Sequence, residues 1–124
     1  MPEPHFEITK AASFDAAHRL PDGPDGHRYG RLHGHSFRVE ATLAGKATGP
    51  MGWVADLAEL DQALKAAASA LDHSLLNDHP GLEQPTLEAL CRHFAERLGS
   101  VFPQLRRISV SRPTVGESCS LDLG

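Results

Sequence analysis

The sequence predicts an α+β fold in which a four-stranded antiparallel sheet carries two helices on one face. Three patterns support this prediction. The first third of the chain alternates apolar and polar residues, the middle repeats apolar residues at helical intervals, and the last stretch alternates again. The expected order is strand, strand, helix, helix, strand, strand, within a single domain that spans residues 1–124.

The first strand is expected in HFEITKAASFDAAHRL, which begins at His5. Side chains of a strand point alternately to opposite faces, so residues of one parity share a face. His18 has the parity of the apolar residues and is therefore predicted to face inward with Phe6, Ile8, Ala12, Phe14 and Ala16. The next segment, PDGPDGHRYGR, is rich in Gly, Pro and Asp and predicts a long connection.

The second strand is expected to begin in GRLHGHSFRVE, residues 30–40. From His35 onward the odd positions are apolar and the even positions are polar, which is the pattern of a half-buried strand. His33 and His35 therefore lie on the inward side of this strand. Because the long connection can return the chain, we expect both to lie beside His18.

These three inward histidines predict a metal site. A single buried histidine is most often a hydrogen-bonded core residue, but three on converging faces are typical of ligands. Neutral imidazole binds zinc well, and two histidines at i and i+2 with a third from the neighbouring strand leave a fourth position open, as catalytic zinc requires. The sequence thus predicts Zn²⁺ bound by His18, His33 and His35.

Two amphipathic helices are expected in the middle of the chain. Asp56 is placed to cap the first, DLAELDQALKAAASALDH, with Glu59 at capping-box spacing. Its predicted buried stripe consists of Leu57, Leu60, Leu64, Ala67, Ala68 and Leu71. Thr86 is placed to cap the second, LEALCRHFAERLGS, which Gly99 ends. Its predicted stripe consists of Leu87, Leu90, Cys91, Phe94 and Leu98.

The last segment, RRISVSRPTVGESCSLDLG, predicts a closing hairpin that is interrupted at Pro113 and Gly116. Such a small sheet has two exposed edge strands, which can pair with another copy, so we expect a homo-oligomer. The two cysteines, Cys91 and Cys119, are expected to be unpaired apolar residues.

Charge and hydropathy exclude several classes of protein. The net charge of −4 and the absence of a basic patch argue against nucleic-acid binding. The start of the chain is polar, and no apolar stretch approaches the roughly 20 residues that cross a bilayer. We therefore expect a cytoplasmic protein without a membrane or nucleic-acid partner.

Four segments carry further information: FDAAHRLPDGPDGHRYGRLHGHSFRVE, GWVADLAEL, LDHSLLND and QPTLEAL. Together they resemble the 6-pyruvoyltetrahydropterin synthase family, in particular the bacterial 6-carboxytetrahydropterin synthases of queuosine biosynthesis. The resemblance implies a tunnelling fold, in which the sheets of three subunits join into a barrel, usually as two stacked trimers. It also implies zinc on the three histidines and a lyase reaction on 7,8-dihydroneopterin triphosphate or a related pterin.

The resemblance assigns proton transfer to three further residues. Asp72 and His73 match the family's aspartate and histidine pair, although they could also simply end the helix. The family's loop cysteine, which acts as the base, aligns with Tyr29. A phenol has a pKa near about 10, compared with about 8.5 for a thiol. Tyr29 with a lowered pKa, or His27, is therefore the candidate base, and the alternative is that Tyr29 only packs in the loop.

A second departure from the family lies in the closing hairpin. The glutamate that accepts hydrogen bonds from the pterin ring aligns with Pro113, which has neither an acceptor side chain nor a backbone N–H. Glu117 is the nearest carboxylate, about 13 Å away if the strand stays extended. It can reach the pocket only if the chain turns at Val115 and Gly116.

Two residues at the start of the second helix are further candidates for substrate binding, Thr86 and Glu88, although a carboxylate there also favours the helix terminus. The leading functional hypothesis is a zinc-dependent pterin synthase. The alternative is a divergent paralogue that keeps the fold and the zinc site but only binds zinc or a pterin. A metal-assisted hydrolase ranks third, because no carboxylate base is placed beside the three histidines.

Overall fold

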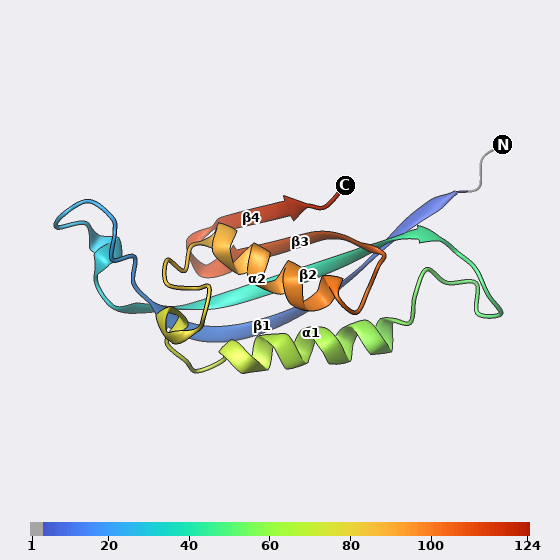
Figure 1. Ribbon diagram of the computed structural model, residues 1–124, viewed down its shortest axis with the longest axis horizontal. Coiled ribbons are helices and arrows are strands. Elements are labelled where there is room, and N and C mark those ends of the chain that lie inside the picture. Colours follow the sequence, from blue (N-terminus) through green and yellow to red (C-terminus); the bar gives the residue numbers. More distant parts are fainter. Residues whose placement is uncertain (1–3) are drawn as a thin grey trace.

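The computed structural model describes residues 4–124, and these form one sheet with two helices (Figure 1). The elements are β1 (His5–His18), η1 (Arg28–Gly30), β2 (His33–Lys46), α1 (Leu57–Leu71), η2 (Leu76–Asp78), α2 (Leu87–Gly99), β3 (Leu105–Arg112), η3 (Pro113–Val115) and β4 (Glu117–Asp122). The strands are antiparallel in the order β1-β2-β3-β4. The predicted fold class and order of elements are confirmed.

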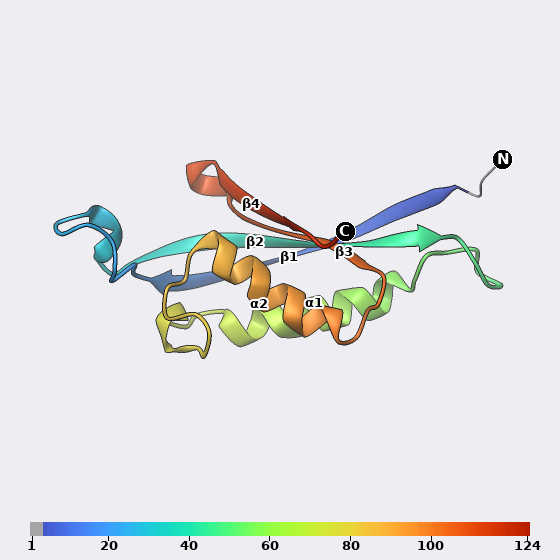
Figure 2. The same ribbon diagram turned by 45° about the horizontal axis from the view of Figure 1, so that its top comes forward.

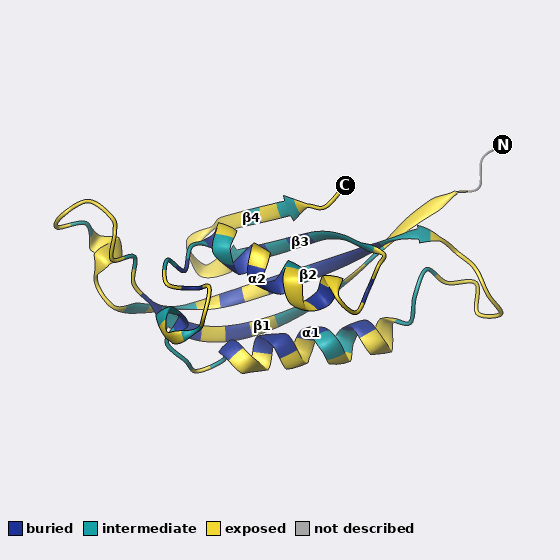
Figure 3. Ribbon diagram, viewed as in Figure 1, coloured by how far each residue is buried: buried dark blue, intermediate teal, exposed yellow. Residues whose placement is uncertain are grey.

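The two helices cover one face of the sheet, which Figure 2 shows as two separate layers. α1 packs on β1, and α2 packs on β3 and β4. The apolar parity of the strands and the inner stripes of the helices meet in this interface (Figure 3). The rings of Phe14 and Phe37 stack there at 5.0 Å. Burial of this apolar surface between the layers is the main stabilising term of the fold.

The helices begin where the sequence predicts. The side chain of Asp56 accepts a hydrogen bond from the amide of Ala58, and Thr86 accepts one from Ala89. Two predicted core residues are exposed instead, so the predictions for Phe6 and Leu57 are wrong. Phe6 lies near the start of β1 and Leu57 is the first residue of α1, and both line an open pocket at the surface.

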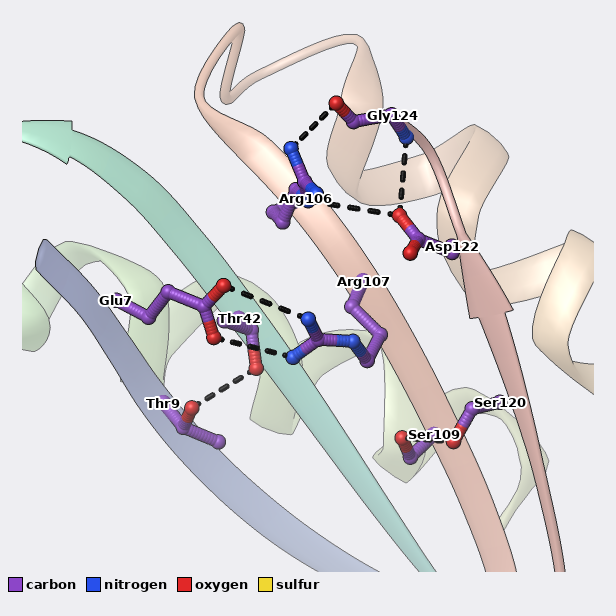
Figure 4. Close-up of polar contacts among 9 residues, drawn as sticks. All are labelled: Glu7, Thr9, Thr42, Arg106, Arg107, Ser109, Ser120, Asp122 and Gly124. Atoms are coloured by element: carbon purple, nitrogen blue, oxygen red, sulfur yellow. Dashed lines mark hydrogen bonds and ion pairs between the residues drawn. The ribbon is translucent and has the colours of Figure 1, made fainter. Parts of the chain in front are cut away.

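The opposite face of the sheet is polar and carries no helix. The hydroxyls of Thr9 and Thr42 lie 2.8 Å apart, and the guanidinium of Arg107 binds both carboxylate oxygens of Glu7 at 3.2 and 3.4 Å (Figure 4). These side-chain pairs between strands satisfy polar groups on this face of the sheet. The sheet thus has one apolar and one polar face, as its alternating strands predict.

The remaining expectations on composition concern the cysteines and the membrane. Cys91 and Cys119 are both free, and burial raises the pKa of the Cys91 thiol to about 12. None of the helices within residues 4–124 has the length and apolar character to cross a membrane.

Candidate metal centre and adjoining cavity

The three predicted histidine ligands lie together at the end of the sheet that carries the long connection. His18 ends β1 and His33 begins β2, and the two are direct cross-strand partners. His35 follows on the same face of β2. The nitrogen atoms that the three side chains can offer to a metal all lie within 4.8 Å of one another. Their rings meet edge to face, with centroids 4.6 to 5.0 Å apart.

Backbone carbonyls set the tautomers of two of these rings. Nδ1 of His18 donates to the carbonyl of Pro85 at 3.0 Å, and Nδ1 of His33 donates to that of Arg31 at 2.6 Å. In the neutral rings both Nε2 atoms are then unprotonated, yet they lie 3.0 Å apart. Two lone pairs at this distance repel unless a proton or a cation lies between them.

Burial decides between these two alternatives. The side chain of His18 is only 1% exposed, and desolvation lowers its pKa to about 4, although its hydrogen bond to Pro85 acts in the opposite direction. Burial and the charge of Arg112 also lower the pKa of His35. A proton is therefore disfavoured at neutral pH. Metal-binding histidines characteristically donate their second nitrogen to a carbonyl, so the residues present fit a metal cation.

A cavity of about 380 Å³ opens from the histidine cluster. It is lined by His18, Leu20, Arg28, Tyr29, His33, His35, Arg112, Val115 and Glu117. Tyr29 comes from η1, where the guanidinium carbon of Arg28 lies 5.3 Å from the centre of its ring. His27 also packs on that ring, with centroids 4.2 Å apart, and is outside the lining of the cavity. Of the two candidate bases, Tyr29 is the one that faces the cavity.

The closing hairpin brings Glu117 into the same cavity. Residues Pro113–Val115 form η3, and Gly116 follows with a φ of 68°, in the left-handed region that favours glycine. This turn reverses the chain, so that Glu117 begins β4 directly opposite Arg112. The condition under which Glu117 can reach the pocket is therefore met. An ion pair of 3.0 Å joins Arg112 Nε to the Glu117 carboxylate.

Asp72 and His73 form a hydrogen-bonded pair at the end of α1. Nδ1 of His73 donates to Asp72 at 2.8 Å, and the amide of Asp15 donates to the other carboxylate oxygen at 2.8 Å. His73 has a φ of 57°, which ends the helix in the manner of a C-terminal glycine. The Asp72 hydrogen bond raises the pKa of His73, and the Asp15 amide followed by His73 lowers the pKa of Asp72.

This pair lies outside the cavity that adjoins the three histidines. Its own surroundings are a second, more open cavity of about 630 Å³, which His73 lines together with Asp15, Ser36 and Thr114. His35 lines both cavities. The His73 side chain is 81% exposed. Within one chain, the pair is thus near the histidine cluster but does not share its cavity.

Thr86 and Glu88 also lie outside the lining of the first cavity. The Thr86 hydroxyl caps α2, and Glu88 is exposed in the first turn of that helix. Sequence reasoning missed Arg112 as a neighbour of the histidines, because its position depends on the register of β3 with β2. It also missed the carbonyl of Pro85, since a backbone acceptor leaves no signal in the sequence.

Comparison with known proteins agrees with this geometry. The sequence model of one family, described as "6-pyruvoyl tetrahydropterin synthase", matches residues 7–122. The chain belongs to this family. Among curated relatives of this family member, the 6-carboxy-5,6,7,8-tetrahydropterin synthase of Synechocystis sp. is 42% identical over an alignment of length 112. The alignment covers 83% of each chain. The protein of that name from Bacillus subtilis is 32% identical over 93 residues, 70% of this chain and 61% of that one.

Among solved structures, the 6-pyruvoyl tetrahydropterin synthase of Caenorhabditis elegans has a TM-score of 0.86 to this chain. It covers 100% of this chain and 99% of its own, at 23% sequence identity. The tunnelling fold expected from the resemblance is therefore shown at the level of one subunit. The family and the histidine cluster together identify a pterin synthase relative with a set of residues that could hold a metal.

Proposed function

We propose that this protein is a zinc-dependent pterin synthase, a lyase of the 6-carboxytetrahydropterin synthase type that acts on 7,8-dihydroneopterin triphosphate or a related pterin. The observation that carries the proposal is the pair of facing, unprotonated Nε2 atoms of His18 and His33 in a chain of this family. The names of the relatives support the substrate class. The alternative, a paralogue without turnover, rests on Tyr29 and Pro113, which replace the family's cysteine and glutamate.

His18, His33 and His35 would hold the zinc ion through neutral imidazole nitrogens. Bound zinc would lower the pKa of a coordinated substrate hydroxyl and stabilise the negative charge that develops during the reaction. The hydrogen bonds to Pro85 and Arg31 orient two of the rings, so that their free nitrogens point toward each other. Imidazole nitrogen atoms, the donors in this cluster, are usual ligands of zinc.

Tyr29 is the residue we assign as the base in place of the family's cysteine. Its ring lines the cavity, and the guanidinium carbon of Arg28 lies 5.3 Å from the centre of that ring. We assign Asp72 and His73 to proton transfer on the opposite side of the substrate. Asp72 holds the proton of His73 on Nδ1 and leaves Nε2 to exchange protons.

Glu117 is the residue we assign to the pterin ring. It lines the cavity and can accept hydrogen bonds from ring N–H groups, which Pro113 cannot. Thr86 and Glu88 remain predictions for substrate binding. The Thr86 hydroxyl already caps α2, so a role at the substrate would have to combine with that structural one.

A homo-oligomer would bring the two cavities into one site. β1 and β4 are the edges of the sheet, and their directions allow the β4 of one copy to pair antiparallel with the β1 of another. Glu117 starts β4 at the same end of the sheet where Asp72 lies beside Asp15 of β1. Such pairing would place Asp72 and His73 of one subunit near the partner's Glu117. We therefore propose a trimer or a hexamer, to be checked by light scattering at micromolar concentration.

The direct test of the proposed function is to incubate the purified protein with dihydroneopterin triphosphate and identify the products by mass. We expect a tetrahydropterin that has lost its triphosphate, and none with the His33→Ala variant. Substrate that binds but returns unchanged would contradict the assignment as an enzyme. The assignment to one domain and to the cytoplasm stays a prediction.

A further inference from the structure

Arg112 and Glu117 form a cross-strand pair that the proposed chemistry has not yet used in full. They face each other at the first register position of the β3–β4 hairpin, and both line the cavity beside the three histidines. The Arg112 side chain is 15% exposed and that of Glu117 is 44% exposed. The arginine is thus held against the protein, while the carboxylate stands at the opening of the cavity.

Glu117 is the only carboxylate among the described residues that line this cavity. A carboxylate has about four acceptor positions, and the ion pair occupies one oxygen. The Arg112 Nε–H lies 3.0 Å from that oxygen but has no aligned hydrogen bond to any described group. The carboxylate therefore keeps acceptor capacity for N–H donors of a ligand.

An exposed glutamate at the start of an edge strand has many rotamers, and fixing one of them upon binding weakens affinity by up to about tenfold. The ion pair with Arg112 reduces this loss, because it holds the carboxylate over the cavity beforehand. The position of the pair follows from the turn at Gly116, which places residue 117 opposite residue 112. The chain thereby has a carboxylate where Pro113 offers none.

We propose that Arg112 is a positioning residue that holds Glu117 in the cavity, and that this pair selects ligands whose ring presents adjacent N–H and amino donors. The inference rests on the proposed function, since it assumes that a pterin occupies this cavity. It goes beyond that function by assigning a role to Arg112, which holds the carboxylate of Glu117 at the cavity.

The test measures binding, which needs no turnover. The purified, metal-containing protein is titrated with 7,8-dihydroneopterin and with an analogue that lacks the 2-amino group, and affinities are read by calorimetry. Glu117→Gln should weaken binding of 7,8-dihydroneopterin by about 10- to 100-fold, because a charge-assisted acceptor is lost. The same change should have a much smaller effect on the analogue. Arg112→Ala should also weaken binding of 7,8-dihydroneopterin. Arg112→Lys should retain most of the affinity of the unmodified protein.

The double variant Arg112→Ala/Glu117→Gln distinguishes positioning from a direct contact. If Arg112 acts through Glu117, the double variant binds no more weakly than Glu117→Gln alone. Arg38→Ala is the matched control, since Arg38 forms a similar pair with Glu40 at 3.1 Å on the uncovered face of the sheet. It should leave affinity unchanged. Metal content is measured for every variant, and Arg112→Gln replaces Arg112→Ala if the latter does not fold.

Three outcomes would overturn the inference. Unchanged affinity in Arg112→Ala shows that Glu117 needs no positioning, and additive losses in the double variant show that Arg112 contacts the ligand itself. Equal losses for both ligands show that the pair does not read the amino group. Failure of the unmodified protein to bind any pterin overturns the proposed function as well, and this result differs from the other three.

Discussion

Two groups of histidines lie at the same end of the sheet in opposite surroundings. His18 is buried with its proton committed to a carbonyl, and burial lowers its pKa to about 4. His73 is exposed and paired with Asp72, which raises its pKa. The same side chain is therefore desolvated and kept neutral in one place, and solvated and more readily protonated in the other. The difference teaches that solvent exposure and hydrogen-bond partner, rather than residue type, decide the chemistry of a histidine.

The largest expected effect is loss of the metal, which tests whether the buried histidines bind a cation. His33→Ala removes the nitrogen that faces His18, and the protein should lose most of its bound metal and its turnover. Loss of a group that merely orients a ligand costs about 10- to 100-fold in metal affinity, so loss of a ligand should cost more. Metal analysis after gentle purification measures this. His73→Ala is the control and should retain the metal, and full metal content in His33→Ala would refute the site.

The next effect concerns the exposed pair. Asp72→Asn replaces the charged acceptor of the His73 proton with a neutral amide, so the pKa of His73 should fall toward its ordinary value. Turnover should decrease by about 10²- to 10⁴-fold, the usual contribution of acid–base catalysis, while the metal content stays the same. An NMR titration of the histidine ring protons gives the pKa. An unchanged pKa would show that Asp72 does not control this ring.

A smaller effect is expected on stability in acid. In the metal-free protein, burial lowers the pKa of His18 and that of His93 from 6.5 to about 4. The folded state then binds fewer protons than the unfolded state between these values, so stability is retained above pH 6.5 and lost as the pH falls toward 4. Each group should contribute on the order of 2–3 kcal/mol to this loss.

Urea unfolding of the metal-free protein at several pH values between neutral and acid measures how steeply the free energy of unfolding falls with pH. His93→Gln should make this dependence less steep without changing a metal ligand. His73→Gln should not, because a raised pKa contributes stability below 6.5 that is lost as the pH rises. If the free energy of unfolding of His93→Gln depends on pH as steeply as that of the unmodified protein, burial does not lower the pKa of His93.

The smallest effect sharpens the role of Thr86. Thr86→Ala removes the cap of α2 and should lower the free energy of unfolding by about 1 kcal/mol. The preceding residue, Pro85, holds the His18 ring, so metal affinity should decrease only slightly. Chemical denaturation and metal titration measure the two quantities. A large rise in KM with unchanged stability would instead support the predicted contact of Thr86 with substrate.

Much of the fold could be predicted because it depends on local pattern. Alternation placed His18, His33 and His35 on inward faces, and the caps at Asp56 and Thr86 begin both helices. The prediction failed for Phe6, which has the correct parity but is exposed near the start of β1. Periodicity reports the face of a residue, whereas burial also requires another element to cover that face.

The sequence by itself determined the family, the order of elements and the convergence of three histidines, because these follow from spacing along single strands and helices. Only the tertiary structure decided that Glu117 joins the cavity and that His73 lies outside it. The first depends on the left-handed turn at Gly116, and the second on hydrogen bonds between the end of α1 and Asp15 of β1. Strand register and chain reversal set both of these distances. A local sequence pattern contains neither of them.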